Sequence, residues 1–232
     1  MKTGAVWCKR QRAAAWLVMR VANGFFRLAE NPVEALVRRA DWQAWEVECF
    51  ELLHGPGFTA DVAGAAVRLA VLPGASLSEA LKAGCLAPGM LAAAGVELRR
   101  AHGLRCGYFG EAWSHGDPHS GNYIFDAATG RARLIDFELR HRRELSAVER
   151  HADDLLVLLQ DVCGRCTAEA WLPLALAFLQ SYARPEVVAV LRGRLRVPGG
   201  WGRLWWGVRT SWMRRAELER RIGALALALE TM

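Results

Sequence analysis

Lysine is scarce in this sequence, and no apolar run is long enough to cross a membrane. Arginine carries nearly all of the basic charge, because Lys2, Lys9 and Lys82 are the only lysines and the formal net charge is +6. The apolar stretch over residues 13–19 is far shorter than the roughly 18 residues of a spanning helix. It also follows several basic residues and is cut by Arg20, which makes it a poor secretory signal. We expect a cytoplasmic protein, soluble or peripheral on the inner face of the membrane.

Cysteine spacing typical of a disulfide framework or a zinc site is also absent. The six cysteines are scattered, and Cys163 and Cys166 form the only C-x-x-C pair. A structural zinc site needs four ligands, and no second pair of cysteines or histidines follows. The pattern suits reduced thiols in a cytosol, with Cys163 and Cys166 as small buried residues at the end of a helix.

The composition favours a folded chain. Apolar residues make up 53% of the 232 positions, so a sizeable core is available and wholesale disorder is excluded. This length is enough for one large domain or for two small lobes around a common cleft.

Residues 113–138, WSHGDPHSGNYIFDAATGRARLIDFE, contain the pattern of a β-hairpin. Residues 123–125 have strand-forming side chains, residues 126–130 are rich in turn formers, and residues 133–135 run back as a second strand. Because a hairpin brings its two ends together, we expect the residues that flank the two strands to be neighbours.

Three oxygen-bearing side chains occupy these flanks. Asn122 precedes the first strand, Asp136 follows the second, and Asp117 lies five residues before Asn122. Two oxygen ligands side by side, with room for water and phosphate, suit Mg²⁺. Asp117 lies on the same loop and is the natural candidate for positioning a nucleophile. The alternative is that Asp117 and Asn122 are turn formers and that Asp136 caps a strand.

The two motifs, in this order, resemble those of the protein-kinase-like superfamily. HGDPHSGN is similar to the catalytic loop H-x-D-x-x-x-x-N, and LIDFE is similar to the strand and metal-binding aspartate of D-F-G. The sequences of these two motifs are most similar to those of small-molecule kinases of that fold. Examples are aminoglycoside and choline phosphotransferases and the kinases of Kdo or heptose in lipopolysaccharide core. The resemblance covers residues from about 9 to 160. It implies that Asp117 accepts a hydroxyl proton and that Asn122 and Asp136 hold Mg²⁺. His115 would brace the loop, and His119 would either face the phosphates or simply lie in the loop.

The resemblance also implies a lysine–glutamate pair at the phosphates of ATP. Lys9 is the only lysine well placed for it, since Lys82 falls after the expected hinge; the alternative is a solvated basic edge. Its expected partner is Glu46, because WEVECFELL resembles the E-W-x-A-L-x-x-L run of heptose kinases; the alternative is an exposed helix face. A Gly-rich loop before the lysine is missing, so either the chain starts late or the phosphate cover is built differently.

Periodicity predicts most of the elements around these motifs. We expect helices over residues 16–28 and 33–53, and strands near residues 61–62 and 66–72. One face of the second helix would carry Trp42, Trp45, Cys49 and either Leu52 or Leu53.

A hinge and two further helices are expected next along the chain. The run VLPG resembles the hinge of sugar and antibiotic kinases, which implies that the backbone at Leu72 binds the adenine edge; an ordinary turn is the alternative. Ser76 and Glu79 have the spacing of a capping box, and residues 90–102 read as a helix beneath the catalytic loop.

The segment after Asp136 separates into a charged run and a helix. The charges of residues 140–150 predict a solvated loop. No A-P-E motif follows this loop, which argues against a protein substrate that binds along the loop. The run ERHADDLLVLLQD resembles the helix whose aspartate receives amide hydrogen bonds from the catalytic loop. Asp154 fits that role best, Asp153 is the runner-up, and a helix N-cap is the alternative. Residues 168–232 read as helices broken at Pro185 and at residues 198–200.

These patterns predict an α+β, two-lobed protein-kinase-like fold. A reduced N-lobe would span residues 1–72 and a mainly helical C-lobe residues 73–232, with a catalytic loop at 113–122 and a metal strand at 133–138. The expected function is transfer of the γ-phosphoryl group of ATP, with Mg²⁺, to a hydroxyl of a small molecule or a lipopolysaccharide-type envelope sugar. No nucleic-acid partner is expected. The alternatives are an atypical protein serine/threonine kinase and a nucleotide-binding pseudokinase.

Positive charge and tryptophan gather near the C-terminus. Residues 192–221 contain nine arginines and two glutamates, a local charge of +7, together with four of the ten tryptophans. On a helix, Trp201, Trp205, Val208 and Trp212 would share one face, as in helices that lie on anionic membrane surfaces. One interpretation is therefore peripheral membrane contact through residues 192–221. The other, commoner for such a stripe, is that the tryptophans pack on the base of the large lobe and the arginines are solvated.

Overall fold

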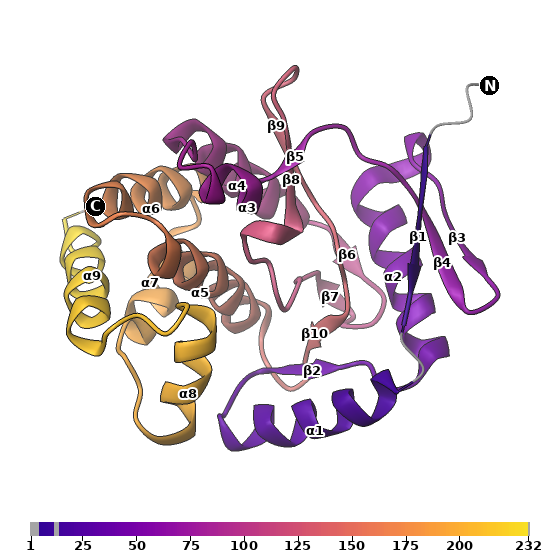
Figure 1. Cartoon of the computed structure of the whole chain (residues 1–232), viewed down its shortest axis with the longest axis horizontal. Coiled ribbons are helices and arrows are strands. Elements are labelled where there is room, and N and C mark those ends of the chain that lie inside the picture. The colour runs from indigo at the N-terminus through magenta and orange to yellow at the C-terminus, as the bar shows by residue number, and fades with distance from the viewer. Residues whose placement is uncertain (1–4, 12–13, 232) are drawn as a thin grey trace.

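The structure is a computed structural model of the whole chain, and it describes residues 5–11 and 14–231. Helices predominate and the strands form small sheets, so the fold is α+β as expected (Figure 1). Short 3-10 helices lie at Gly55–Gly57 and Ser120–Asn122. In chain order the other elements are β1 (Val6–Arg10), α1 (Ala15–Leu28), β2 (Val33–Ala35), α2 (Arg39–His54), β3 (Ala60–Ala63), β4 (Ala66–Ala70), β5 (Ala75–Ser76), α3 (Leu77–Lys82), α4 (Pro88–Ala101), β6 (Arg105–Cys106), β7 (Glu111–Ala112), β8 (Tyr123–Asp126), β9 (Arg131–Leu134), β10 (Leu139–His141), α5 (Ala147–Arg165), α6 (Ala168–Tyr182), α7 (Pro185–Arg194), α8 (Gly200–Arg209) and α9 (Arg215–Ala228).

Strands β1, β4 and β3 form an antiparallel sheet with β4 in the middle, and α2 packs along β3 and β4 (Figure 1). Lys9 of β1 lies opposite Val67 of β4. The apolar face predicted for α2 is buried, because Trp42, Trp45, Cys49 and Leu53 are each at most 5% exposed.

The helix predicted over residues 33–53 begins later than expected. Residues Val33–Ala35 form β2, which pairs antiparallel with β10, and α2 begins only at Arg39. Three residues are too few to show a strand period, and only the pairing with a distant segment reveals this strand.

The charged run over residues 140–150 is not the solvated loop that was predicted. Its start belongs to β10, and His141 and Arg150 are fully buried. Arg150 binds the Glu111 carboxylate through Nη1 at 2.8 Å and donates from Nη2 to the carbonyl oxygen of Ala112 at 2.9 Å. These contacts satisfy a buried guanidinium that would otherwise be costly to bury.

The hairpin of β8 and β9 forms as predicted and joins β5 in a second three-stranded sheet. The Asp126 side chain accepts a hydrogen bond from the Ala128 amide at 3.0 Å and stabilises the turn. Just beyond the paired strands, the Ile135 amide donates to the carbonyl oxygen of Asn122 at 3.0 Å. The two ends of the hairpin are therefore neighbours, as the sequence predicted.

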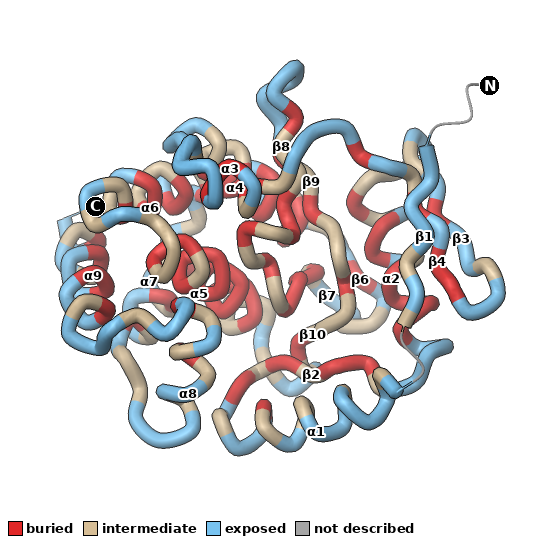
Figure 2. Tube along the Cα trace, viewed as in Figure 1, coloured by how far each residue is buried: buried red, intermediate tan, exposed pale blue. Residues whose placement is uncertain are grey.

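Helix α5 runs through the interior of the helical part of the molecule and is buried along most of its length (Figure 2). Ser146 and Glu149 form a capping box at its start, so Asp154 lies two turns inside the helix and is not its N-cap. The capping box predicted for α3, from Ser76 and Glu79, is also present.

Helices α4 and α6 make a close contact beside α5. The approach requires Gly95, because a Cβ there would lie 2.4 Å from the carbonyl oxygen of Phe178.

The C-terminal helices begin and end close to the predicted breaks. Pro185 opens α7, and α8 begins at Gly200, the last residue of the Pro-Gly-Gly run. The predicted tryptophan face is only partly right, because α8 ends at Arg209 and leaves Trp212 beyond it in a left-handed conformation. The most buried tryptophan of this segment is Trp206, which the predicted stripe did not include. Within the described ranges, no helix combines the length and apolarity that crossing a membrane requires.

Candidate active site

Lys9 lies at the centre of three carboxylates. Its Nζ is 3.0 Å from Oε2 of Glu46 and 3.3 Å from Oε1 of Glu138, and it also pairs with Oδ1 of Asp136. Oε2 of Glu46 accepts a further hydrogen bond from the Phe137 amide at 3.1 Å. The expected Lys9–Glu46 contact is therefore present. Neither residue takes the exposed alternative, because the side chain of Lys9 is 15% exposed and that of Glu46 is fully buried.

Burial and charge oppose each other in this cluster. Burial alone would lower the pKa of Lys9, but the carboxylates of Glu46, Asp136 and Glu138 more than offset it and hold the pKa above its usual range. Burial raises the pKa of Glu46, and the Lys9 ammonium opposes that rise. One ammonium among three carboxylates leaves excess negative charge when all are ionised, and a bound cation would offset it.

Asp154 holds the start of the loop over residues 113–122. It is fully buried, and its two carboxylate oxygens accept hydrogen bonds from the amides of His115 and Gly116, each at 2.8 Å. Gly116 has φ +91°, and a Cβ there would lie 3.1 Å from the backbone of Arg140, so this position requires glycine. Asp153, the other candidate, instead faces Nε2 of His141 at 3.3 Å.

A neutral imidazole completes the contacts of Asp154. Nε2 of His102 lies 2.9 Å from Oδ2 of Asp154, and its Nδ1 lies 2.8 Å from the hydroxyl of Tyr182. Burial lowers the pKa of His102 well below its usual value. The ring therefore stays neutral, donates from Nε2 to the carboxylate and accepts from Tyr182.

His115 connects this loop to the segment that carries Asp136. Its Nε2 donates to the carbonyl oxygen of Ile135 at 3.0 Å, and its Nδ1 accepts from the Asp117 amide at 3.3 Å. The ring packs on Phe137 with a centroid distance of 5.2 Å. Burial lowers the pKa of His115 to about 4, which keeps the ring neutral near pH 7. With both ring nitrogens hydrogen-bonded to the backbone, His115 holds the loop against the segment that carries Asp136.

Asp117 is the acceptor side chain that the loop presents. Nδ2 of Asn122 donates to its carbonyl oxygen at 2.9 Å, and its half-buried carboxylate lies 3.7 Å from Nη2 of Arg209 and 4.0 Å from Nε2 of His119. Burial raises the pKa of Asp117, while Arg209 and His119 oppose that rise. A carboxylate with a raised pKa that stays partly exposed to solvent is suited to accept a proton. His119 is anchored because its Nδ1 accepts from the Gly121 amide at 3.0 Å.

Asp136 and Asn122 are the side chains that could hold a metal. Asp136 has φ +68°, a left-handed conformation that non-glycine residues rarely adopt and that is often found at functional sites. Since Nδ2 of Asn122 is used within the loop, its Oδ1 is the atom left to bind an ion. No three or more His, Cys, Asp or Glu side chains of residues 5–11 and 14–231 form a metal-binding group. Two protein oxygens fit Mg²⁺ that is held jointly with phosphate and water.

A pocket of about 570 Å³ opens beside the Lys9 cluster. Lys9, Glu46 and Asp136 line its charged part, and this volume is typical of small-molecule sites. The apolar lining consists of Trp7, Phe50, Leu69, Ala70, Val71, Leu72, Ile124 and Ile135. Leu72 therefore lies at the wall of a pocket that reaches Lys9, and the binding of an adenine edge by its backbone stays a prediction.

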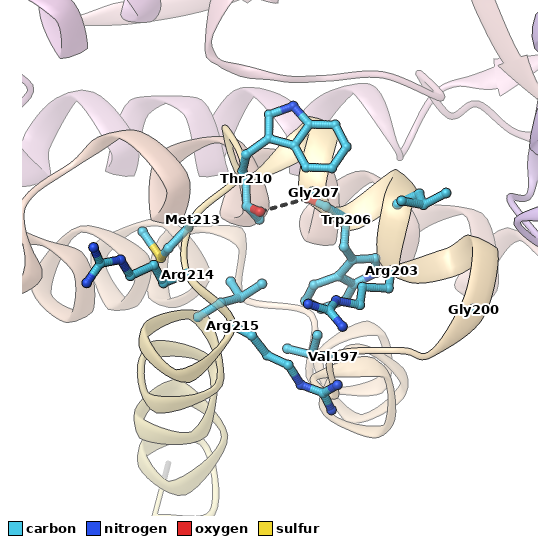
Figure 3. Close-up of a pocket in the computed structure, with 12 residues that line it drawn as sticks. Val197, Gly200, Arg203, Trp206, Gly207, Thr210, Met213, Arg214 and Arg215 are labelled. Carbon is cyan, nitrogen blue, oxygen red and sulfur yellow. Dashed lines mark hydrogen bonds between the residues drawn. The ribbon is translucent and has the colours of Figure 1, made fainter.

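Another pocket, of about 620 Å³, lies among the C-terminal helices (Figure 3). Arg203, Trp206 and Thr210 of the α8 region face Met213 and Arg215 across it. None of the predicted site residues lines this pocket, so it does not belong to the candidate active site.

Arg209 and Glu138 are the site residues that sequence reasoning missed. Glu138 stands where D-F-G has glycine, and its carboxylate reaches Lys9. Arg209 lies on α8, 92 positions after Asp117, among arginines interpreted as solvated or membrane-facing. Its side chain is only 8% exposed, and its guanidinium lies over the ring of Trp205 at 4.6 Å. No local signal distinguishes Arg209 from its exposed neighbours.

No protein-family model matches the chain, and no curated protein matches its sequence.

Proposed function

We propose that the chain is a kinase with a two-lobed, protein-kinase-like fold that transfers the γ-phosphoryl group of ATP to a hydroxyl of a small molecule or an envelope sugar. One observation carries the proposal. Lys9 of β1, Glu46 of α2 and Asp136 after β9 meet at the charged part of an apolar pocket. The loop that presents Asp117 and Asn122 is bound to the same segment through His115.

The pocket suits a nucleotide in one orientation. Its apolar walls, which include Leu72, Ile124 and Ile135, would take the base, and Lys9 would bind a phosphate oxygen. Glu46 orients Lys9 and is itself held by the Phe137 amide. The small lobe would consist of the β1–β4–β3 sheet with α2, and the helices would form the large lobe.

Asp136 and Oδ1 of Asn122 would hold Mg²⁺ at the phosphates. The ion would neutralise phosphate charge as the bond to the leaving group breaks. The protein contributes the positions of these two oxygens, because the Ile135–Asn122 hydrogen bond joins the segments that carry them.

Asp117 would act on the acceptor. Its carboxylate accepts the proton of the attacking hydroxyl as that oxygen bonds to the γ-phosphorus, while the bond to the β–γ bridging oxygen breaks and leaves its electron pair on ADP. Asn122 and His115 hold the backbone of Asp117, and Asp154 holds that of His115. Catalysis would thus depend mainly on positioning and charge.

The segment after Asp136 favours a small acceptor over a protein. Residues Leu139–His141 pair with β2, and α5 is already capped at Ser146. Little extended chain is left along which a peptide could bind.

Calorimetry with a non-hydrolysable ATP analogue, with and without Mg²⁺, tests the proposal. Lys9→Met should weaken nucleotide binding by tenfold or more, whereas Lys82→Met, a change at an exposed lysine on α3, should not. Asp136→Ala should remove the dependence of binding on Mg²⁺. Wild-type protein that binds no nucleotide would refute the proposal. Binding without turnover on sugars, lipopolysaccharide core fragments and proteins would favour the pseudokinase alternative.

A further inference from the structure

Large apolar side chains are exposed mainly on two helices. Of the fifteen large hydrophobic residues that are exposed in the described chain, eight lie on α1 and α8, each between 42% and 67% exposed. They are Trp16, Leu17, Val18, Val21 and Leu28 of α1, with Trp201, Leu204 and Val208 of α8. We call these eight residues the α1–α8 face.

On α1 the apolar stripe points outward. Leu17, Val21 and Leu28 recur at i, i+4 and i+11, on the side opposite the buried Phe26. An ordinary surface helix has polar residues on its outer side. Helix α1 is therefore apolar on its inner side, where Phe26 packs with β2, and again on its outer side.

On α8 a similar stripe continues the surface. Trp201, Leu204 and Val208 recur at i, i+3 and i+7, whereas Trp206 points inward and is buried. Aromatic contacts join the two helices, because Phe25 lies 6.3 Å from Trp201 and Phe26 lies 5.1 Å from Trp205 between ring centroids. Figure 1 shows α1 and α8 next to one another along one edge, and Figure 2 shows exposed residues along both.

The charge beside this face is positive. Neither helix contains an acidic residue, while Arg20 and Arg27 of α1 are exposed beside the apolar side chains. Glu30, just past α1, is the nearest acidic residue in sequence. Two copies of the face would repel one another, which disfavours self-association. Tryptophan, aliphatic side chains and arginine together match the acyl boundary and phosphates of a bilayer.

We propose that the α1–α8 face binds an anionic membrane surface, with the apolar stripes at the acyl boundary and the arginines on lipid phosphates. This proposal does not depend on the kinase activity. It also differs from binding through residues 192–221 as a whole, because Trp206, Arg209 and Arg221 of that segment are turned inward.

Co-sedimentation with vesicles tests it. Wild-type protein should sediment with phosphatidylcholine vesicles that contain phosphatidylglycerol, and binding should fall as salt rises. Arg20→Gln with Arg27→Gln should weaken binding by roughly tenfold or more. Leu17→Gln with Val21→Gln should weaken it comparably, since both side chains would lose their apolar contact with lipid.

Matched changes elsewhere provide the controls. Arg99→Gln with Arg131→Gln, and Val62→Gln with Leu227→Gln, alter exposed residues on other elements and should leave vesicle binding unchanged. Thermal unfolding would verify that every variant is folded. Protein that stays in the supernatant at low salt, or controls that reduce binding equally, would overturn the proposal. So would a concentration-dependent dimer that Leu17→Gln with Val21→Gln dissociates, because a second copy would then cover the face.

Discussion

Replacing Asp154 with alanine should destabilise the protein by several kcal/mol and disorganise the loop over residues 113–122. The carboxylate accepts hydrogen bonds from the amides of His115 and Gly116 at 2.8 Å and from His102 at 2.9 Å. His102 can move its proton to the nitrogen beside Tyr182, but the two buried amides would lose the acceptor to which they donate. A buried donor left without an acceptor costs about 1–3 kcal/mol, so the two amides predict a loss of about 2–6 kcal/mol.

Urea denaturation at pH 7 measures this loss. Asp154→Asn keeps one acceptor oxygen and should fall between wild type and Asp154→Ala, whereas Asp61→Ala removes an exposed ion pair and should change little. Should Asp154→Ala unfold within about 0.5 kcal/mol of wild type, the scale of a neutral surface substitution, Asp154 does not hold the loop.

Three further predictions concern the rate and the pH dependence. Asp117→Asn should lower phosphoryl transfer by about 100-fold or more while nucleotide binding survives; a near-normal rate would remove Asp117 from its role. Arg209→Gln should raise the pKa of Asp117 further and move the acidic limb of the pH–rate profile to higher pH. Arg209→Lys, which keeps the positive charge, should return the limb to its wild-type position. An acidic limb that does not move in Arg209→Gln would mean that Arg209 does not act on Asp117. The free energy of unfolding should fall as the pH drops from about 6.5 to about 4, because burial lowers the pKa of His54 and His115 to about 4 and that of His102 and His151 further, and the unfolded chain binds their protons first. Each histidine should lower the free energy of unfolding by about 1 kcal/mol per pH unit in that window. Denaturation at several pH values measures this slope, and a free energy of unfolding that does not change with pH would contradict the prediction.

The parts of the site that sequence reasoning predicted are those with a local signature. A turn between two short strands was enough to place Asn122 and Asp136 at adjacent ends of a hairpin, because the hairpin closes on itself. The face of α2 could be predicted because its apolar residues repeat with the helical period. The positions of Lys9 and Asp154 came from the resemblance, since a single charged residue has no period.

The rest depends on partners that are distant in sequence. Arg150 lies in a charged run and looks solvated until Glu111 and the carbonyl of Ala112 are seen around it. The pairing of β2 with β10 likewise joins segments about a hundred positions apart. Composition reports how much charge a segment carries, but burial depends on which acceptors the fold brings to each guanidinium.

Helix α8 also shows that composition does not predict which side chains are buried, and its two sides serve the two different proposals. Its residues Trp201, Leu204 and Val208 are exposed, while Trp206 is buried and Arg209 reaches the carboxylate of Asp117. A helix only about 10–12 Å across thus carries one set of side chains toward the candidate base and another toward solvent. Substitutions on the outer side leave Arg209 in place, and Arg209→Gln leaves the outer stripe intact. The effects of membrane contact and of the chemistry at Asp117 can therefore be measured independently, although α8 takes part in both.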